Sequence, residues 1–495
     1  MEQEVAAKRR VTLCIYKGLP FVLIKIMKKT KIVATIGPST TDAKKMEELL
    51  IAGVNVMRMN FSHGDFAEHQ IKVDNAKIAS EKTGIPVALL QDLGGPKIRI
   101  GDFYKESIVL EEGQTFTLTT EKIVGDEKRV YINYAPLPKE VEVGGLIMLH
   151  DGKKKLEITN IKGNEVVCKV IIGGEIKGRR GVNLPGAKLS ISSLTKKDKD
   201  DLEFGLKNKV DFVAFSFVRR PDDVSELCDI LDKAKSKAKI IAKIEDVEGL
   251  ENIDKIIELV DGIMIGRGDF GIEIGVENMP MVQKEIIKKC NKAGKPVITA
   301  THMLESMIKS PVPTRAEVSD IANAILDGTD AIMLSEETAL GQYPVEAVKV
   351  MTKVAERVEK EMGYVKKYFT ETGKEDNVTD AVSAEAVDLA HNIGAKYIVA
   401  LTYYGFAARM IARYRPIQRV IAMTPNEKVA NQLLLTFGCN PVLIEKLNTL
   451  PAAIKEAKKH CLKSKLAQKG DKIIIVAGMP FGKSGMTNTI LVERV

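Results

Sequence analysis

Stretches of consecutive apolar, largely β-branched residues recur eight times between Lys31 and Ser335. In seven of them the hydrophobicity is continuous rather than alternating, which is typical of parallel strands buried on both faces. Amphipathic segments at 43–51, 197–206 and 281–292 lie between such stretches and predict helices. Eight strand and helix units in succession predict a (β/α)8 TIM barrel. The stretches are KIVATIG (31–37), VNVMRMNF (54–61), PVALLQD (86–92), VDFVAFSFV (210–218), KIIAKIE (239–245), DGIMIG (261–266), KPVITAT (295–301) and TDAIMLS (329–335).

Polar residues gather where these apolar stretches end. A TIM barrel collects its active site at the carboxyl ends of its strands, so this pattern predicts one shared mouth. The residues in question are Arg58, Asn60, Asp92, Lys243, Glu245, Asp269, Thr301 and Ser335.

The strand and helix pattern breaks between the third and fourth stretches. Residues 97–183 contain short segments of alternating hydrophobicity, punctuated by glycines and by Pro136 and Pro138, which predict an inserted all-β domain. An insertion rooted at the barrel mouth is well placed to act as a lid that closes over a substrate. A domain used only for oligomer contacts is the alternative.

A third domain follows the barrel segments, which we place at 28–96 and 184–363. Residues 364–379 form a charged, weakly periodic linker, and the remainder of 364–495 alternates strand and helix, which predicts an open α/β sheet. Its loops at 402–406 and 479–486 lie where such a sheet would bind an anion or effector. The second of these loops contains Gly482, Lys483, Ser484 and Gly485, a weak signal for phosphate binding.

Residues 1–27 precede the first predicted strand. A basic cluster at 8–10 is followed by an apolar run at 11–27 that superficially resembles a signal peptide. Lysines and a proline interrupt this run, and it is too short and too charged to span a bilayer. We therefore expect an N-terminal extension without a packing role, with the natural start at Met27.

Composition narrows the class of protein. Lys and Arg total 74 against 66 for Asp and Glu, and no basic arm is interleaved with aromatics, so the sequence does not favour nucleic-acid binding. The excess of basic over acidic residues is equally consistent with a small anionic substrate. The six cysteines form no Cys-x-x-Cys pair, which argues against a zinc site or disulfide framework and fits a reducing cytoplasm.

Lys243, Glu245 and Asp269 carry the clearest chemical signal. Two successive strands end at these residues, so both carboxylates should reach one Mg²⁺, which prefers hard oxygen ligands. Lys243 lies two residues before Glu245 and therefore leaves its strand on the same face, where its ammonium can stabilise developing negative charge. A single amphipathic helix, 247–259, is expected between the two strands. The structural alternative is a surface salt bridge between strand ends.

Several motifs in order resemble the pyruvate kinase family. They cover nearly everything from Lys31 onward, and a series of blocks is far more specific than one motif. The motifs are MNFSHG (59–64), LGGPKIRIG (93–101), RRGVNLPG (179–186), IAKIED (241–246), GRGDFG (266–271), THMLESM (301–307), PTRAE (313–317) and MLSEETA (333–339). The resemblance implies a barrel with a lid and a regulatory α/β domain, a homotetramer, and conversion of phosphoenolpyruvate and ADP to pyruvate and ATP in glycolysis.

The resemblance also implies roles for individual residues. Arg58 and Lys243 are expected on the phosphoryl group, and Thr301 beside the substrate carboxylate. Backbone N–H groups of Gly268 and Asp269, if they open a helix, can receive that carboxylate. Ser335 and Glu337 are expected in the proton relay to the enolate. Glu245 and Asp269 are expected to hold Mg²⁺ or Mn²⁺, and the nucleotide contacts are expected at Asn60, Phe61, Ser62, His63, Arg99 and Arg180.

The chain departs from the family pattern at the monovalent-cation site. Potassium-dependent members carry a glutamate at the position of Lys97. A lysine there brings a fixed ammonium near the site and can supply the missing positive charge, so we expect activity without K⁺. By resemblance the oxygen ligands of a K⁺ ion would be Asn60, Ser62, Asp92 and Leu93, which leaves residual K⁺ binding open.

Smaller departures occur elsewhere. His302 stands where the family usually has Gln and Glu336 where it usually has Gly, and both are interpreted as tolerated variation. Tyr403 and Tyr404 replace a Ser/Thr-rich loop, so we expect no strong activation by fructose bisphosphate. Another phosphorylated effector, such as AMP or a sugar monophosphate, is expected to use the loop at 482–485.

Two other classes of function compete with this interpretation. A Mg²⁺-dependent aldolase or lyase acting on a pyruvate enolate would use the same metal ligands in the same fold. Such an enzyme has no need for Arg58, Arg99 and Arg180 beneath a lid, so ADP binding separates the two. A catalytically silent relative that binds metabolites is the second alternative, and turnover would exclude it.

Overall fold

The computed structural model describes residues 28–364, 369, 377–447, 449–480 and 486–495. Two predictions lie outside this part of the chain, namely the N-terminal extension at 1–27 and the phosphate-binding loop at 482–485.

The eight apolar stretches form the eight parallel strands of a closed barrel, which confirms the predicted fold class. The strands follow the order β1-β16-β15-β14-β13-β12-β3-β2 around the barrel. Their residues are almost all buried, as expected for strands with a packed interior and a ring of helices outside. The strands are β1 (Lys31–Thr35), β2 (Val56–Asn60), β3 (Ala88–Leu93), β12 (Phe212–Phe215), β13 (Lys239–Ile244), β14 (Gly262–Gly266), β15 (Val297–Ala300) and β16 (Ala331–Leu334).

Helices surround the barrel and bury its outer face. The three amphipathic segments predicted as helices are α2, α5 and α10, each slightly longer than expected. The outer helices are α2 (Ala43–Ala52), α3 (Phe66–Thr83), α5 (Lys196–Asn208), α6 (Pro221–Lys233), α7 (Val247–Glu251), α8 (Ile253–Leu259), α10 (Met279–Ala293), α11 (Arg315–Asp327) and α13 (Pro344–Glu361). Shorter elements at the mouth are α9 (Arg267–Ile274), η1 (Glu305–Ile308) and α12 (Glu336–Ala339).

The prediction of one helix at 247–259 is wrong. The segment divides into α7 and α8 at Asn252. The side-chain Nδ2 of Asn252 donates to the carbonyl oxygen of Arg219 at 2.9 Å and to that of Glu248 at 3.1 Å. Asn252 has φ −96° and ψ 7°, away from regular helical values, and its side chain can hold this turn through these bonds. The apolar periodicity does not reveal them.

The inserted segment forms a separate β domain. A six-stranded sheet in the order β11-β7-β8-β9-β5-β6 and a two-stranded sheet, β10-β4, enclose its own core. The elements are β4 (Ser107–Leu110), β5 (Thr115–Thr119), β6 (Arg129–Tyr131), α4 (Leu137–Glu140), β7 (Leu146–Leu149), β8 (Lys154–Lys162), β9 (Glu165–Ile172), β10 (Gly174–Lys177) and β11 (Val182–Asn183).

The C-terminal domain is the predicted open α/β sheet. Its strands follow the order β19-β18-β17-β20-β21, and all pairs are parallel except β20 with β21. Sequence analysis did not anticipate β19 or β21. The elements are α14 (Val378–Asn392), β17 (Tyr397–Leu401), α15 (Phe406–Ala412), β18 (Arg419–Thr424), α16 (Glu427–Gln432), η2 (Leu433–Leu435), β19 (Cys439–Leu443), α17 (Leu450–Lys463), β20 (Lys472–Ala477) and β21 (Thr489–Arg494).

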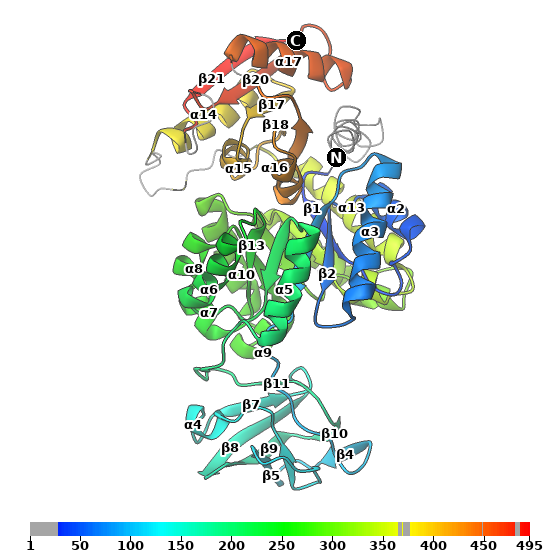
Figure 1. Ribbon diagram of the computed structural model, residues 1–495, viewed down its shortest axis with the longest axis vertical. Coiled ribbons are helices and arrows are strands. Elements are labelled where there is room, and N and C mark those ends of the chain that lie inside the picture. The colour runs from blue at the N-terminus through cyan, green and yellow to red at the C-terminus, as the bar shows by residue number, and fades with distance from the viewer. Residues whose placement is uncertain (1–27, 365–368, 370–376, 448, 481–485) are drawn as a thin grey trace.

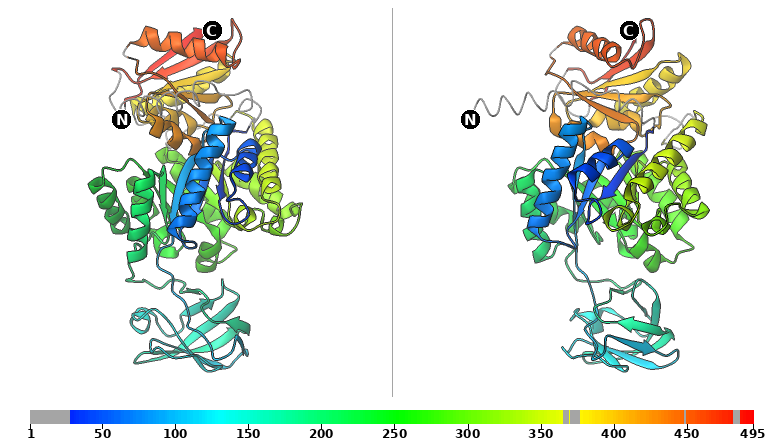
Figure 2. Two further views of the ribbon diagram at one scale, coloured as in Figure 1. Left: turned by 45° about the vertical axis from the view of Figure 1, so that its right-hand side comes forward. Right: turned by 90° about the vertical axis from the view of Figure 1, so that its right-hand side faces the viewer.

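The β domain and the C-terminal domain lie at opposite ends of the barrel (Figures 1 and 2). Leu434 and Leu435 of η2 belong to the cluster that fills the barrel interior, so the C-terminal domain packs against the amino ends of the strands. The carboxyl ends therefore face the β domain. No helix among the described residues is both long enough and apolar enough to cross a membrane.

Candidate active site

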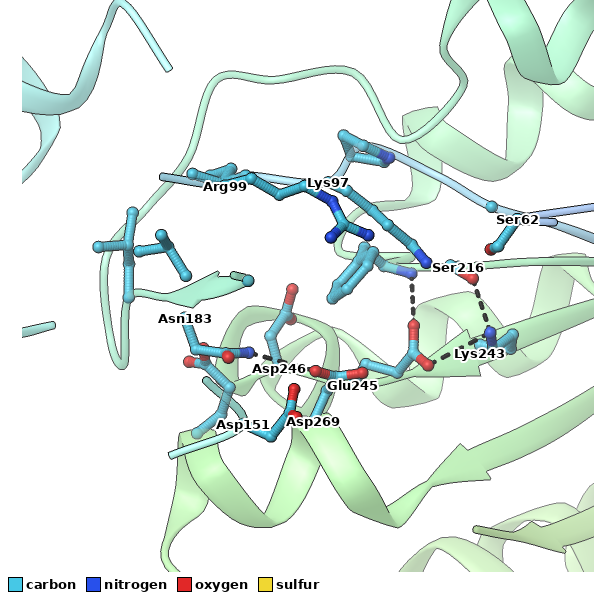
Figure 3. Close-up of a pocket in the computed structure, with 18 of the residues that line it drawn as sticks. Ser62, Lys97, Arg99, Asp151, Asn183, Ser216, Lys243, Glu245, Asp246 and Asp269 are labelled. Atoms are coloured by element: carbon cyan, nitrogen blue, oxygen red, sulfur yellow. Dashed lines mark hydrogen bonds and ion pairs between the residues drawn. The ribbon is translucent and has the colours of Figure 1, made fainter. Parts of the chain in front are cut away.

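A cavity of about 460 Å³ lies between the barrel mouth and the β domain (Figure 3). Residues from both the barrel and the β domain line this cavity, so closure of the β domain against the barrel would change the shape of the cavity. The predicted site residues that line it are Arg58, Asn60, Ser62, Lys97, Arg99, Arg180, Lys243, Glu245, Asp269, Thr301 and Ser335.

Lys243 reaches the cavity because of strand alternation. Ile241 packs inside the barrel, so the period of two places Lys243, near the end of β13, on the same interior face, and Glu245 follows directly after the strand. The Lys243 ammonium donates to Ser216 Oγ at 2.6 Å and lies 3.4 Å from Asp92 Oδ1 and 3.3 Å from Glu245 Oε1. Burial opposes its charge, but the Asp92 and Glu245 carboxylates outweigh this effect and raise the pKa of Lys243.

Arg58 is fixed from the neighbouring strands. Its Nε donates to Asp92 Oδ2 at 2.6 Å and its Nη1 donates to Thr35 Oγ1 at 2.8 Å. Burial raises the pKa of Asp92, but the charges of Arg58 and Lys243 overcome this and lower it below its ordinary value. Asp92 thus stays ionised and positions two cations at the bottom of the cavity.

Glu245 and Asp269 present the two carboxylates expected to hold a divalent cation. Glu245 Oε2 accepts the N–H of Phe217 at 3.0 Å, and a Cβ at Gly266 would lie 2.7 Å from Glu245 Cγ. The first glycine of GRGDFG therefore makes room for this carboxylate. Burial raises the pKa of Glu245, the Lys243 ammonium opposes the rise, and the negative charge of Asp269 adds to it.

This donor set fits Mg²⁺ or Mn²⁺. Both groups are hard oxygen donors, and a divalent cation between them would offset their mutual repulsion. In the described part of the chain no group of three or more His, Cys, Asp or Glu residues is arranged to hold a metal ion. Mg²⁺ usually keeps several of its ligand positions for water and substrate oxygens, so two carboxylates suffice to hold it.

Thr301, which follows β15, is hydrogen-bonded to the start of α9, which follows β14. It adopts a positive φ of 66°, and its Oγ1 accepts the N–H of Gly268 at 2.9 Å. Helix α9 begins at Arg267, so Gly268 and Asp269 do open a helix. The Gly268 N–H is already hydrogen-bonded to Thr301, however, and Gly268 does not line the cavity.

Ser335 lies at the end of β16, where its backbone N–H donates to Glu337 Oε2 at 2.7 Å. Glu337 Oε1 accepts the N–H of Leu304 at 3.1 Å. Burial raises the pKa of Glu337 despite these two donors. Glu337 is thus placed to fix the backbone of Ser335, while Ser335 itself borders the cavity.

The residues predicted for the nucleotide divide into two groups. Asn60, Ser62, Arg99 and Arg180 line the cavity, and Arg180 Nε is buried without a hydrogen-bond partner among the described residues. Phe61 and His63 do not line it, and neither do Asp92 and Leu93 of the possible K⁺ site. The Phe61 ring is buried and stacks on His69 with centroids 3.8 Å apart.

Lys97 lies among charged groups at the cavity wall. Burial lowers its pKa, the positive charges of Arg99 and Lys243 lower it further, and Asp269 and Glu245 oppose this. Several oxygens of the possible K⁺ site already have partners within the protein. Asn60 Oδ1 accepts the N–H of Ser62 at 3.1 Å, and the Leu93 carbonyl accepts Ser216 Oγ at 3.0 Å.

Sequence reasoning missed several residues of this site. Ser216 ends an apolar strand as Lys243 does, and that position could have identified it. Asn183 lies inside the quoted motif RRGVNLPG, and its Nδ2 donates to Asp269 Oδ1 at 3.4 Å. Glu273 also lines the cavity, and burial together with the negative charges of Asp246 and Asp269 raises its pKa to about 8.

Comparison with known proteins gives a consistent result. Residues 27–348 match the family description "Pyruvate kinase, barrel domain" and residues 380–493 match "Pyruvate kinase, alpha/beta domain". A pyruvate kinase of Clostridium acetobutylicum is 43% identical over 472 residues, which cover 95% of this chain and 100% of that protein. One of Staphylococcus epidermidis is 44% identical over 473 residues, covering 95% of this chain and 81% of the relative.

A solved structure agrees with these relatives. The crystal structure of a pyruvate kinase from Cryptosporidium parvum superposes with a TM-score of 0.90 at 37% identity, and covers 96% of this chain and 97% of that one. Two family descriptions matched in order, full-length relatives and a common fold lead to one conclusion: the chain belongs to the pyruvate kinase family of enzymes.

Proposed function

We propose that this protein transfers the phosphoryl group of phosphoenolpyruvate to ADP, giving pyruvate and ATP in the last step of glycolysis. The observation that carries the proposal is the buried charge cluster of Arg58, Asp92, Lys243 and Glu245 at one cavity beneath the lid. Phosphoryl transfer needs preorganised positive charge around the moving group and little covalent chemistry from the protein.

Arg58 and Lys243 are the cations proposed for the phosphoryl group. Both are held in place before substrate arrives, because Asp92 bonds to Arg58 and lies beside Lys243. Preorganised charges need no rearrangement when charge develops in the transition state. Lys243 then stabilises the enolate of pyruvate, and we assign Thr301 to the carboxylate of the substrate and Ser335 to the relay that protonates the enolate.

Glu245 and Asp269 are proposed to hold Mg²⁺ or Mn²⁺. When bound, this cation would supply Lewis-acid stabilisation of phosphoryl and enolate oxygens. On the lid side, Arg99 and Arg180 are proposed to bind the phosphates of ADP together with Asn60 and Ser62. Their presence at the same cavity favours a nucleotide-dependent enzyme over an aldolase or lyase.

We propose further that the enzyme works without K⁺, because Lys97 lines the same cavity as Asn60 and Ser62, two of the expected ligands of that ion. A cytoplasmic homotetramer is proposed from the family.

In the C-terminal domain, the exposed Tyr403 and Tyr404 offer few hydrogen-bond donors to a sugar bisphosphate. Another phosphorylated effector is therefore proposed, and fructose bisphosphate of submicromolar affinity in equilibrium binding would contradict this.

Pyruvate release from phosphoenolpyruvate tests the function directly. The purified protein is assayed with Mg²⁺, with and without ADP, in buffers free of sodium and ammonium and with or without K⁺. We expect ADP-dependent turnover that is indifferent to K⁺. Pyruvate formation without ADP would favour a lyase, and no turnover at all would favour a silent relative.

A further inference from the structure

Helix α9 packs against both the barrel and the inserted β domain. Phe270 and Gly271 are buried, with Phe270 in the core around the barrel. Asp269, Ile272 and Glu273 are spaced i, i+3 and i+4, which places them together on another flank of the helix. That flank faces the inserted domain, and β11 and α9 are in contact.

The inserted domain meets each of the three side chains. Asn183 Nδ2 donates to Asp269 Oδ1 at 3.4 Å (Figure 3). A Cβ on Gly152 would lie 3.3 Å from Ile272 Cγ1, so the lid backbone passes close to that side chain. Glu273 lines the same cavity as Asn183 and Leu184. The flank of α9 that carries Asp269, Ile272 and Glu273 thus forms the surface on which the inserted domain rests, and we call this surface the seat of the lid.

Strand register explains why Asn183 points at this seat. Val182 and Leu184 belong to the core of the lid, so the residue between them must point away from that core. The register of β11 is set by antiparallel pairing of Val182 with Leu149 and of Asn183 with Met148. The lid core therefore directs the Asn183 amide toward the barrel mouth.

The two carboxylates of the metal site differ in their support. Glu245 has partners on the barrel, since Oε1 lies 3.3 Å from Lys243 Nζ and Oε2 accepts the Phe217 N–H at 3.0 Å. Within the part of the chain that the structure describes, Asn183 is the group that hydrogen-bonds to the Asp269 side chain. Glu245 is therefore held by groups of the barrel, whereas the hydrogen bond to Asp269 comes from the inserted domain.

We propose that Asn183 is a positioning residue that orients Asp269 for a divalent cation when the lid rests on α9. The inference rests on the proposed function in one respect, that Glu245 and Asp269 hold this cation. Hydrogen-bond donors to a metal-binding group hold it in its binding orientation, and their loss commonly weakens metal affinity by about 10- to 100-fold. Lid seating and metal affinity are thus coupled through one amide.

Direct Mn²⁺ binding to the free protein tests this proposal. The variant Asn183→Leu keeps the size of the side chain and removes its donor. Titration followed by electron paramagnetic resonance, without phosphoenolpyruvate or ADP, should show Mn²⁺ affinity weakened by about 10-fold. In the assay, the Mg²⁺ concentration for half-maximal rate should rise, and kcat at saturating Mg²⁺ should recover to within about threefold of the parent.

Asn164→Leu is the matched control. Asn164 also donates its side-chain amide to a lid carboxylate, Glu121, at 3.1 Å, but it does not line the cavity. It should leave Mn²⁺ affinity unchanged. The variant Ile272→Ala, which removes a different contact of the seat, should weaken Mn²⁺ binding in the same direction as Asn183→Leu.

Three results would overturn the proposal. Unchanged Mn²⁺ affinity in Asn183→Leu with reduced turnover would mean that Asn183 contacts substrate instead. Equal losses in Asn183→Leu and Asn164→Leu would mean that general lid integrity is responsible. If Glu245→Gln binds Mn²⁺ as tightly as the parent, Glu245 does not hold the cation, and the premise that Glu245 and Asp269 form the metal site is wrong. Absence of turnover in the parent would refute the proposed function and leave the binding result interpretable.

Discussion

Lys243 is a charge held in place by other charges. Its ammonium lies beside two buried carboxylates and bonds to Ser216, so its orientation does not depend on a bound substrate. Removal of one member of such a buried network leaves the other charges uncompensated. The proposed role of Lys243 can therefore be tested by changing this one residue.

The variant Lys243→Met should lower kcat by roughly 10²- to 10³-fold, equivalent to about 3 to 4 kcal/mol of lost transition-state stabilisation. Lys239→Met is the control, because Lys239 occupies the same strand but pairs with Asp261 at 2.7 Å at the opposite end. Steady-state kinetics should show near-normal turnover in the control. Near-normal turnover in Lys243→Met would remove the proposed role.

The variant Lys97→Glu should create a dependence on K⁺, because it replaces the built-in ammonium by a carboxylate that needs a counterion. We expect low activity without K⁺ and recovery as K⁺ is added. The control Lys97→Met lacks both charges and should lose activity without acquiring the same response to K⁺. A strict K⁺ requirement in the parent would contradict the role of Lys97.

At the scale of elements, the contact of α3 with the end of β2 depends on a histidine. His69 is 1% exposed, its ring stacks on Phe61, and its Nε2 lies 3.0 Å from the His63 carbonyl oxygen, which requires a proton on that nitrogen. Burial lowers the pKa of His69 to about 4. The folded protein thus keeps a neutral ring at pH values where the unfolded chain is protonated.

This histidine predicts a pH-dependent loss of stability. Its folded-state pKa is below the unfolded value, so its contribution is complete above pH about 6.5 and is lost as pH falls toward 4, up to about 3 kcal/mol. His69→Phe should remove that part of the decline in thermal unfolding between pH 6.5 and 4. His391→Phe, at an exposed position, should decline as the parent does. Parallel curves for His69→Phe and the parent would refute the assignment.

At the scale of the whole molecule, a buried ion pair joins the C-terminal domain to the barrel. Arg415 Nη2 donates to Asp330 Oδ2 at 2.9 Å, and the two side chains are 2% and 5% exposed. Asp330 Oδ1 also accepts the N–H of Phe437 at 3.0 Å. Together with Leu434 and Leu435 in the barrel interior, these contacts make the junction a continuous core.

Arg415→Met should destabilise this junction, because it leaves the Asp330 charge buried without its partner, at a cost of about 3 to 5 kcal/mol. Calorimetry should show a lower thermal midpoint for the barrel, on the order of 5 to 10 °C. Arg357→Met breaks an exposed pair with Glu361, whose side chains are 71% and 63% exposed, and should change the midpoint little. Equal shifts in both variants would contradict the special role of the junction.

The sequence by itself determined the local elements and the side chains that each presents. Continuous apolar stretches predicted the eight barrel strands, and the period of two placed Lys243 and Glu245 on one face. Hydrophobic periodicity reports which face of an element is buried, so these features follow from nearest neighbours along the chain. The same signal failed at Asn252, where hydrogen bonds to the carbonyls of Arg219 and Glu248 divide the expected helix.

Only the tertiary structure decided which distant groups meet. Ser216 bonds to Lys243 across 27 positions and Asn183 reaches Asp269 across 86, and no periodicity encodes such pairs. The filling of the barrel interior by Leu434 and Leu435 is equally invisible in the chain order. These contacts depend on how strands close into a barrel and how domains pack on its two ends. Local pattern therefore specifies the chemical groups, and packing specifies the site that they form.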